Sequence, residues 1–242
     1  MTSTRIAWRQ ALMTIGLTVY CFCWGIEAGQ AQEPAQDVLN NLATMSRDLK
    51  VDPPLTGGIE RCGQANASYN PATRHITLCR EWREDARALF NTYRYMSAAE
   101  LDQVADDSEL FIVLHEVGHA LIDVLHLPVT GREEDVADQF AVATLLHQGD
   151  AGERAIVHTA RHWMFRADHR WSSPFWDEHS VDAQRSFNLA CWLYGTNPAK
   201  YAGLVGQPLL GRDLPKQRAD HCEAESAKML ESLTRLIRAA AK

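Results

Sequence analysis

The pattern His-Glu-x-x-His stands inside an apolar run at residues 111–121, and it constrains the fold more than any other feature of the sequence. The run predicts a buried helix, on which His115 and His119 are one turn apart on the same face. Two neutral imidazoles placed in this way can bind one Zn²⁺ from the same side. Glu116 flanks that face, where it can accept a proton from a zinc-activated water. We expect a metal site rather than a chance match, because a buried helix rarely contains two histidines and a glutamate that nothing pairs.

Composition places the chain among ordinary globular proteins. Its 242 residues allow one domain or two small ones, and 46% of them are hydrophobic and 23% charged. The net charge of −7 and the lack of any Lys/Arg cluster give no electrostatic reason to expect nucleic acid as a partner. The sequence contains neither a Gly-rich phosphate loop nor an internal repeat. We expect a single domain over residues 32–242.

Residues 1–31 have the features of a secretory signal peptide. Arg5 and Arg9 are basic, residues 11–26 are largely apolar, and Gly29-Gln30-Ala31 fits a small-x-small cleavage site. The apolar run is short for a membrane span, which needs about 20 residues. We therefore expect export to the periplasm or the medium, with cleavage after Ala31. An uncleaved membrane anchor through residues 10–26 is the alternative.

Four cysteines remain after that cleavage, and four cysteines allow three pairings. An even number in an exported chain suggests two disulfides. Cys62 and Cys79 bracket a predicted β-hairpin, so we expect them to pair, and Cys191 then pairs with Cys222. Buried free thiols are the alternative. Zinc ligation by cysteine is less expected, because the sequence has no C-x-x-C pair.

The predicted fold class is α+β, mostly α, with a small β-element before the His-Glu-x-x-His helix. A turn at Asn70-Pro71-Ala72-Thr73 indicates a β-hairpin over residues 58–80. Ser97 and Glu100 resemble a capping box that opens a helix. A polar and aromatic loop is expected at residues 166–174. Hydrophobic periodicity predicts helices at residues 37–50, 81–95, 98–105, 108–125, 133–147, 151–164, 180–194 and 217–241.

A catalytic zinc site needs three protein ligands and one open position. Downstream of the motif, Glu134, Ala137 and Asp138 form the pattern Glu-x-x-Ala-Asp. On these residues the chain resembles the gluzincins, in which a second helix contributes a glutamate to the zinc. The resemblance implies that Glu134 is the third ligand and that Asp138 orients a zinc-bound histidine. The helix dipole alone would explain Glu133 and Asp135 at the start of this helix.

Two other side chains compete for the third position. His126 is on the same helical face as His119 but about 10 Å further along the axis, which is too far while the helix continues. Asp123, one turn past His119, is a weaker competitor that could instead orient a ligand. The metzincin pattern does not fit, because Leu125 and Ile122 stand where it needs His and Gly.

Further motifs of the sequence are the hairpin end Ile76-Thr77-Leu78-Cys79, Asp177-Glu178-His179-Ser180, Gln184-Arg185 and Cys191-Trp192-Leu193-Tyr194-Gly195. With these motifs the chain resembles a bacterial family of metallopeptidases, over about residues 37–201. It implies a zincin-like fold, one Zn²⁺, and a peptide or protein substrate bound by strand addition along the hairpin. His179, Arg185 and Tyr194 are candidate donors to the oxyanion of the reaction. Surface or core roles are the alternative for all three.

These inferences together predict a zinc metallopeptidase in which Glu116 moves the proton of the attacking water. Endopeptidase and exopeptidase activity are not distinguished by the sequence. A noncatalytic, zinc-stabilised binding module of the cell envelope is the alternative. Such a module would keep the three ligands, but it would have no use for Glu116.

Overall fold

The computed structural model describes residues 33–92, 96–168, 176–206 and 214–240. Helices predominate and a small sheet precedes the longest of them, so the expected fold class is confirmed. The strands are β1 (Thr56–Glu60), β2 (Ala67–Asn70) and β3 (His75–Cys79). The helices are α2 (Pro34–Asp48), α3 (Glu81–Asn91), α4 (Ala98–Val124), α5 (Glu133–Leu146), α6 (Asp150–Asp168), α7 (Asp182–Thr196), the short 3₁₀ helix η1 (Ala202–Leu204) and α8 (Lys216–Ala240).

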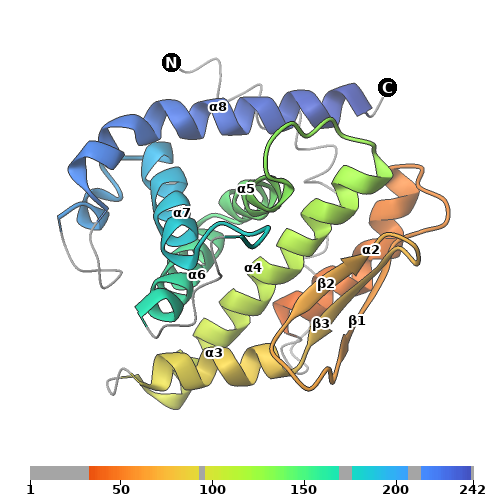
Figure 1. The fold of residues 1–242 in the computed structure, drawn as a ribbon, viewed down its shortest axis with the longest axis horizontal. Helices are drawn as coiled ribbons and strands as arrows, with labels where there is room; N and C mark the ends of the chain where they lie inside the picture. The colour runs from red at the N-terminus through yellow and green to blue at the C-terminus, as the bar shows by residue number, and fades with distance from the viewer. Residues whose placement is uncertain (1–32, 93–95, 169–175, 207–213, 241–242) are drawn as a thin grey trace.

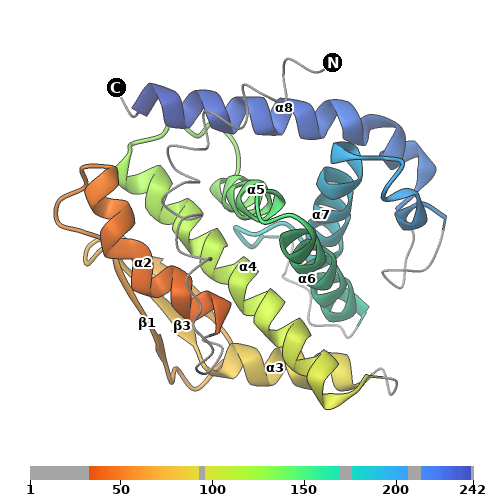
Figure 2. The same ribbon diagram turned by 180° about the vertical axis from the view of Figure 1, so that it is seen from behind.

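Helix α4, which carries the His-Glu-x-x-His motif, is the centre of the fold (Figure 1). It crosses the molecule diagonally, with α2 and the sheet on one side and α5, α6 and α7 on the other, and both views agree (Figure 2). All residues from 107 to 118 are buried. This stretch of α4 has no solvated face, which explains why apolar residues occur on every side of it.

Helix α4 is continuous, whereas the sequence predicted two helices at residues 98–105 and 108–125. The predicted capping box at its start is confirmed, with Ser97 and Glu100 bonding each other's backbone N–H groups. The expected break fell at Asp107, which is buried mid-helix. Arg154 and His158 from α6 donate hydrogen bonds to its carboxylate over 2.9 and 2.7 Å, so the buried charge is paired and the helix continues.

The sheet has the strand order β1-β3-β2, which corrects the predicted single hairpin over residues 58–80. Strands β2 and β3 do form an antiparallel hairpin, but β1 pairs with β3 in parallel. Residues 61–66 cross the end of β3 and place β2 on its far side. β3 takes the centre because Ile76 and Leu78 are the fully buried residues of this sheet. Strand β2 is therefore an edge strand.

Both predicted disulfides are confirmed, Cys62–Cys79 and Cys191–Cys222. The first joins the chain just after β1 to the end of β3, and the second joins α7 to α8. Among the described residues, no helix combines the length and the apolar character that a membrane crossing requires.

The remaining predicted helices are present with shifted ends. The largest change is in α6, which extends to Asp168 and so includes residues 166–168 of the predicted loop. The rest of that loop, residues 93–95 of the predicted helix 81–95, the signal peptide at 1–31 and the alternative anchor at 10–26 lie outside the described residues.

Candidate metal centre

The centre forms where α4 and α5 pack closely. Gly118 of α4 faces Ala137 of α5, and a Cβ atom at Gly118 would lie 3.0 Å from the Ala137 Cα. The absence of that Cβ lets the two helices approach each other. This contact brings His115 and His119 of α4 beside Glu134 in the first turn of α5.

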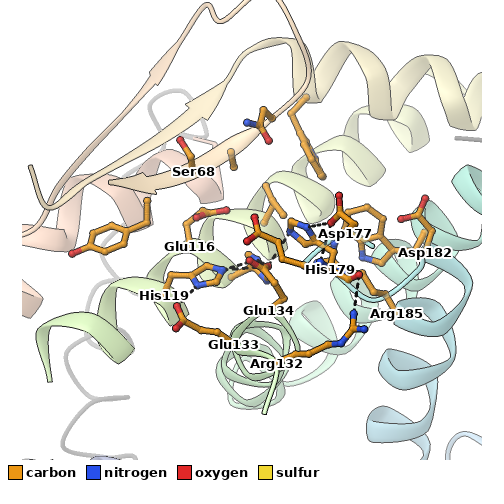
Figure 3. A pocket seen from close by; sticks show the side chains of 18 of the residues that line it. Ser68, Glu116, His119, Arg132, Glu133, Glu134, Asp177, His179, Asp182 and Arg185 are labelled. Atoms are coloured by element: carbon orange, nitrogen blue, oxygen red, sulfur yellow. Dashed lines mark hydrogen bonds and ion pairs between the residues drawn. The ribbon is translucent and has the colours of Figure 1, made fainter. Parts of the chain in front are cut away.

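The three expected ligands converge. Glu134 Oε2 lies 3.1 Å from His115 Nε2 and 3.3 Å from His119 Nε2, and the two nitrogens are 3.2 Å apart. Figure 3 shows His119 and Glu134 pointing toward one another at the floor of the cleft. Ligands bound tetrahedrally at 2.0–2.1 Å from Zn²⁺ are about 3.3 Å apart. The donor set and its spacing therefore fit one such ion.

Each of these imidazoles is oriented by a carboxylate on its other ring nitrogen. His115 Nδ1 donates to Asp138 over 2.8 Å, and His119 Nδ1 donates to Glu133 over 2.8 Å. With Nδ1 as the donor, each neutral ring turns the lone pair of Nε2 toward Glu134. The lone pairs of the two Nε2 atoms and the carboxylate oxygen of Glu134 therefore face one another away from solvent. They would repel one another unless a positive charge lay between them.

The pKa values of His119 and Glu134 also indicate that a positive charge is favoured between these side chains. Burial lowers the pKa of His119, but Glu134 and Glu133 outweigh it and raise the pKa to about 9. Burial raises the pKa of Glu134, but the imidazoles of His115, His119 and His179 lower it far below its usual range. In the absence of a metal, the group therefore takes up protons.

Glu116 lies next to the converging ligands, on the side of β2 (Figure 3). The residue is buried, and burial raises the pKa of its carboxyl, an effect opposed by His115 and His119. The backbone N–H of Tyr69 in β2 is a hydrogen-bond donor to it. The carboxylate is thus held between the edge strand and the imidazoles.

Asp138 is shared between His115 and Arg185 of α7. Arg185 donates to both carboxylate oxygens, from Nε over 2.9 Å and from Nη2 over 2.6 Å, and its Cζ lies 3.9 Å from the centroid of Trp163. Burial raises the pKa of Asp138, but Arg185 and His115 lower it to about 2. Arg185, a candidate oxyanion donor in the sequence, is therefore committed to Asp138.

His179 directs its ring into the centre from the segment before α7. Its Nε2 is 2.9 Å from Glu134 Oε2, and its Nδ1 is 2.9 Å from Asp177 Oδ1, which also accepts from the His179 backbone N–H. Arg132 donates to the His179 carbonyl over 3.1 Å. The third candidate, Tyr194, packs against the hydrophobic core and is not among the cleft residues.

The two side chains that competed with Glu134 for the third ligand position do not join the converging ligands. His126 follows the end of α4 with a positive φ of 49° and belongs to none of the ligand groups formed by the described residues. Asp123 accepts a hydrogen bond from the Tyr69 hydroxyl over 2.7 Å. That bond ties the edge strand to α4.

Two carboxylates of the centre were not singled out by the sequence. The helix dipole was sufficient to explain an acidic residue such as Glu133 at the start of α5. Asp177 was noted only as part of a motif that indicates family membership. The spacing of Asp177, two residues before His179, is the one local signal that could have indicated their contact. The partner of Glu133 depends on how α5 crosses α4, which no local pattern specifies.

A cleft of about 1010 Å³ runs over the centre, between β2 and the helices. The bond from Cys79 N–H to the Asn66 carbonyl sets which residues of β2 bond inward to β3. By the alternation of an antiparallel ladder, Ala67 and Tyr69 direct their backbone groups to the open edge. Both line the cleft, as do Ser68, Trp82 and Trp163.

Comparison with known proteins gives a family for the chain. The family model DUF4344, described as "Putative metallopeptidase", matches residues 25–237. The match covers most of the sequence, so the chain belongs to this family. Neither the search of curated proteins nor the search of solved structures found a match.

Proposed function

We propose that this protein is a zinc-dependent peptidase of zincin-like fold, with His115, His119 and Glu134 as the ligands of one Zn²⁺. The observation that carries the proposal is the convergence of two Nε2 atoms and one carboxylate oxygen within 3.1–3.3 Å, beside a buried glutamate that does not belong to the group. The family description supports the same class of reaction.

Glu116 is the proton carrier in this proposal. A bound Zn²⁺ would supply Lewis acidity, both to the peptide carbonyl and to the attacking water. Glu116 accepts the proton of that water and delivers it to the leaving amine. Its buried position beside the ligands supports this role, because burial raises the carboxyl pKa and so makes Glu116 a stronger base than an exposed glutamate.

His179 is the donor to the oxyanion. Its Nε2 is directed into the cleft at Glu134, and its Nδ1 faces Asp177. Glu134 and Asp177 raise the pKa of His179, and the imidazolium form carries N–H groups on both ring nitrogens, so that its Nε2 can donate to the oxyanion. Arg185 directs its Nε and Nη2 groups to the buried Asp138, and Tyr194 is not among the residues that line the cleft. These contacts favour His179 among the three candidates.

The peptide substrate binds along β2. The backbone groups of Ala67 and the carbonyl of Tyr69 are directed to the open edge, above the metal ligands. An extended peptide can add to such an edge as a further strand and place one of its peptide bonds over Glu116. The substrate is therefore a segment in extended conformation.

The rival function is a noncatalytic binding module that zinc stabilises. A mixed peptide library incubated with the purified protein decides between the two functions. We expect cleavage that a chelator abolishes and that added Zn²⁺ restores. Cleavage that survives metal removal would contradict the zinc mechanism, and a zinc-loaded protein that cleaves nothing would favour the module.

A further inference from the structure

A second group of metal-ligating side chains adjoins the first and shares Glu134 with it. Glu134, Glu178 and His179 each offer one ligand atom, and the three atoms lie within 4.8 Å of one another. We propose that this group is a second, weaker site for Zn²⁺ and that its occupation inhibits the enzyme. The inhibitory part rests on the proposed function, whereas the binding of a second ion can be measured independently of hydrolysis.

His179 has the contacts of a metal ligand. In His115 and His119, a carboxylate on Nδ1 leaves Nε2 directed at Glu134. Asp177 does the same for His179, whose Nε2 faces Glu134 Oε2 at 2.9 Å. Carboxylate–histidine pairs of this kind orient zinc-binding imidazoles. A cation between His179 and Glu134 would replace the hydrogen bond that now joins them.

One ion cannot bind the imidazoles of His115, His119 and His179 together in their present positions. The ring centroids of His115 and His119 are 4.8 Å apart, whereas those of His115 and His179 are 6.3 Å apart. Within the described residues, His179 groups with Glu134 and Glu178 and not with the other two histidines. Two ions bridged by a shared carboxylate are the arrangement this spacing allows, and bridged ions are commonly about 3.5–4 Å apart.

Charge around the second group favours a cation. Glu178 is exposed, so an ion can reach it from solvent, and Asp177 and Glu133 are further carboxylates of the same cleft. Carboxylates outnumber arginines among the side chains that line the cleft, and an excess of one sign of charge raises the local concentration of the counter-ion. Arg132, which bonds the His179 carbonyl, opposes this attraction, as do Arg166 and Arg185 of the same cleft. Repulsion from the first ion and the shared ligand make the second site the weaker one.

Occupation of the second site would remove a group that the reaction needs. The Nε2 of His179 would bind the ion and could no longer donate to the oxyanion. Glu134 would also divide its carboxylate between two ions. Excess zinc should therefore lower the turnover number, while the first ion stays bound.

The experiment measures zinc per chain by equilibrium dialysis against chelator-buffered zinc, together with the rate of peptide hydrolysis. We expect one zinc at low free concentration, a second at higher concentration, and a fall in rate that coincides with the second. Glu178→Gln should retain the first zinc and its activity. It should also shift both the second binding step and the inhibition to free zinc at least roughly tenfold higher, because a direct ligand is lost.

Glu223→Gln, the same change at an exposed residue of α8, is the matched control and should behave as the unaltered protein. The proposal is overturned if the unaltered protein binds no second zinc, or if Glu178→Gln leaves the second step in place. A protein that binds both ions but hydrolyses nothing at any zinc level would instead refute the proposed function, and the second site would stand.

Discussion

Each imidazole of the metal centre has a carboxylate on its Nδ1 atom, yet the three carboxylates differ in their surroundings. Asp138 is buried and also pairs with Arg185, whereas the side chain of Glu133 is 51% exposed and the side chain of Asp177 is 29% exposed. Similar hydrogen bonds can therefore contribute very differently to the stability of the fold.

Replacement of the two carboxylates on the zinc ligands should separate metal affinity from stability. Glu133→Gln should weaken zinc binding by roughly tenfold without destabilising the fold, because it changes only an exposed partner of His119. Asp138→Asn should weaken zinc binding by roughly 10–100-fold. It should also cost about 3 kcal/mol of stability, since it leaves the Arg185 charge buried and unpaired. Zinc titration and thermal unfolding of both variants provide the comparison, and equal stability of the two variants would contradict it.

Replacement of His179 tests its role in the reaction. His179→Ala should fold and retain most of its zinc, because none of the three proposed ligands is removed. Its turnover number should fall by roughly 10²–10³-fold, the loss typical of one oxyanion donor. The Michaelis constant should change much less. A variant that loses zinc in proportion to its activity would show that His179 acts through the metal instead.

Much of the centre was predictable from residue types, their spacing and a family resemblance. His115, Glu116 and His119 follow from the motif, and the gluzincin resemblance added Glu134 and Asp138, which the structure brings together with them. Glu133 was missed because an acidic residue at a helix start has a sufficient electrostatic explanation, and Asp177 because it was noted only as part of a motif of the family resemblance. Their partners could be identified only once the packing of the elements was known.

At the scale of elements, the separation of α4 and α5 sets the geometry of the centre. Gly118 is in contact with Ala137 and Phe140, so that helix-to-helix distance depends on a missing side chain. The elements that were predicted wrongly from the sequence also depend on contacts with neighbouring elements. The predicted break between residues 105 and 108 is absent from α4, where partners on α6 pair the buried Asp107. The parallel pairing of β1 with β3 depends on a crossing that the turn signals do not encode.

Gly118→Ala should push α5 away from α4 and so move Glu134 relative to the histidines. The new Cβ would meet the Ala137 backbone at 3.0 Å, and overpacking of this kind costs about 1–3 kcal/mol. We expect lower stability together with weaker zinc binding. Gly131→Ala is the matched control, because a Cβ there meets nothing within 4 Å. If Gly118→Ala bound zinc as tightly as the control, the close packing would not be what places Glu134.

At the scale of the whole molecule, one hydrophobic cluster joins residues from α2 to α8. This supports our proposal that residues 32–242 form a single domain. The two disulfides suggest an oxidising environment, as expected of an exported protein. They close loops with sequence separations of 17 and 31 residues, and loops of this size contribute about 3–4 kcal/mol each in the chain-entropy model.

We propose that residues 1–31 are removed during export to the periplasm or the medium. The basic start, the short apolar run and the small-x-small end predict a mature chain that begins at Gln32. The intact mass of the exported protein should equal that of residues 32–242 with four cysteines oxidised. A mass that still includes residues 1–31 would support the membrane-anchored alternative instead.

The central claim assigns metal binding and proton transfer to different residues of one centre, and Glu116→Gln separates them. Zinc content and peptide hydrolysis are measured on this variant beside Glu134→Ala. Glu116→Gln should bind about one zinc per chain and lose hydrolysis by roughly 10²–10⁴-fold, because an amide cannot accept the water proton. Glu134→Ala should lose zinc, because it removes one of three protein ligands. Full activity of Glu116→Gln, or full zinc and full activity of Glu134→Ala, would contradict the account.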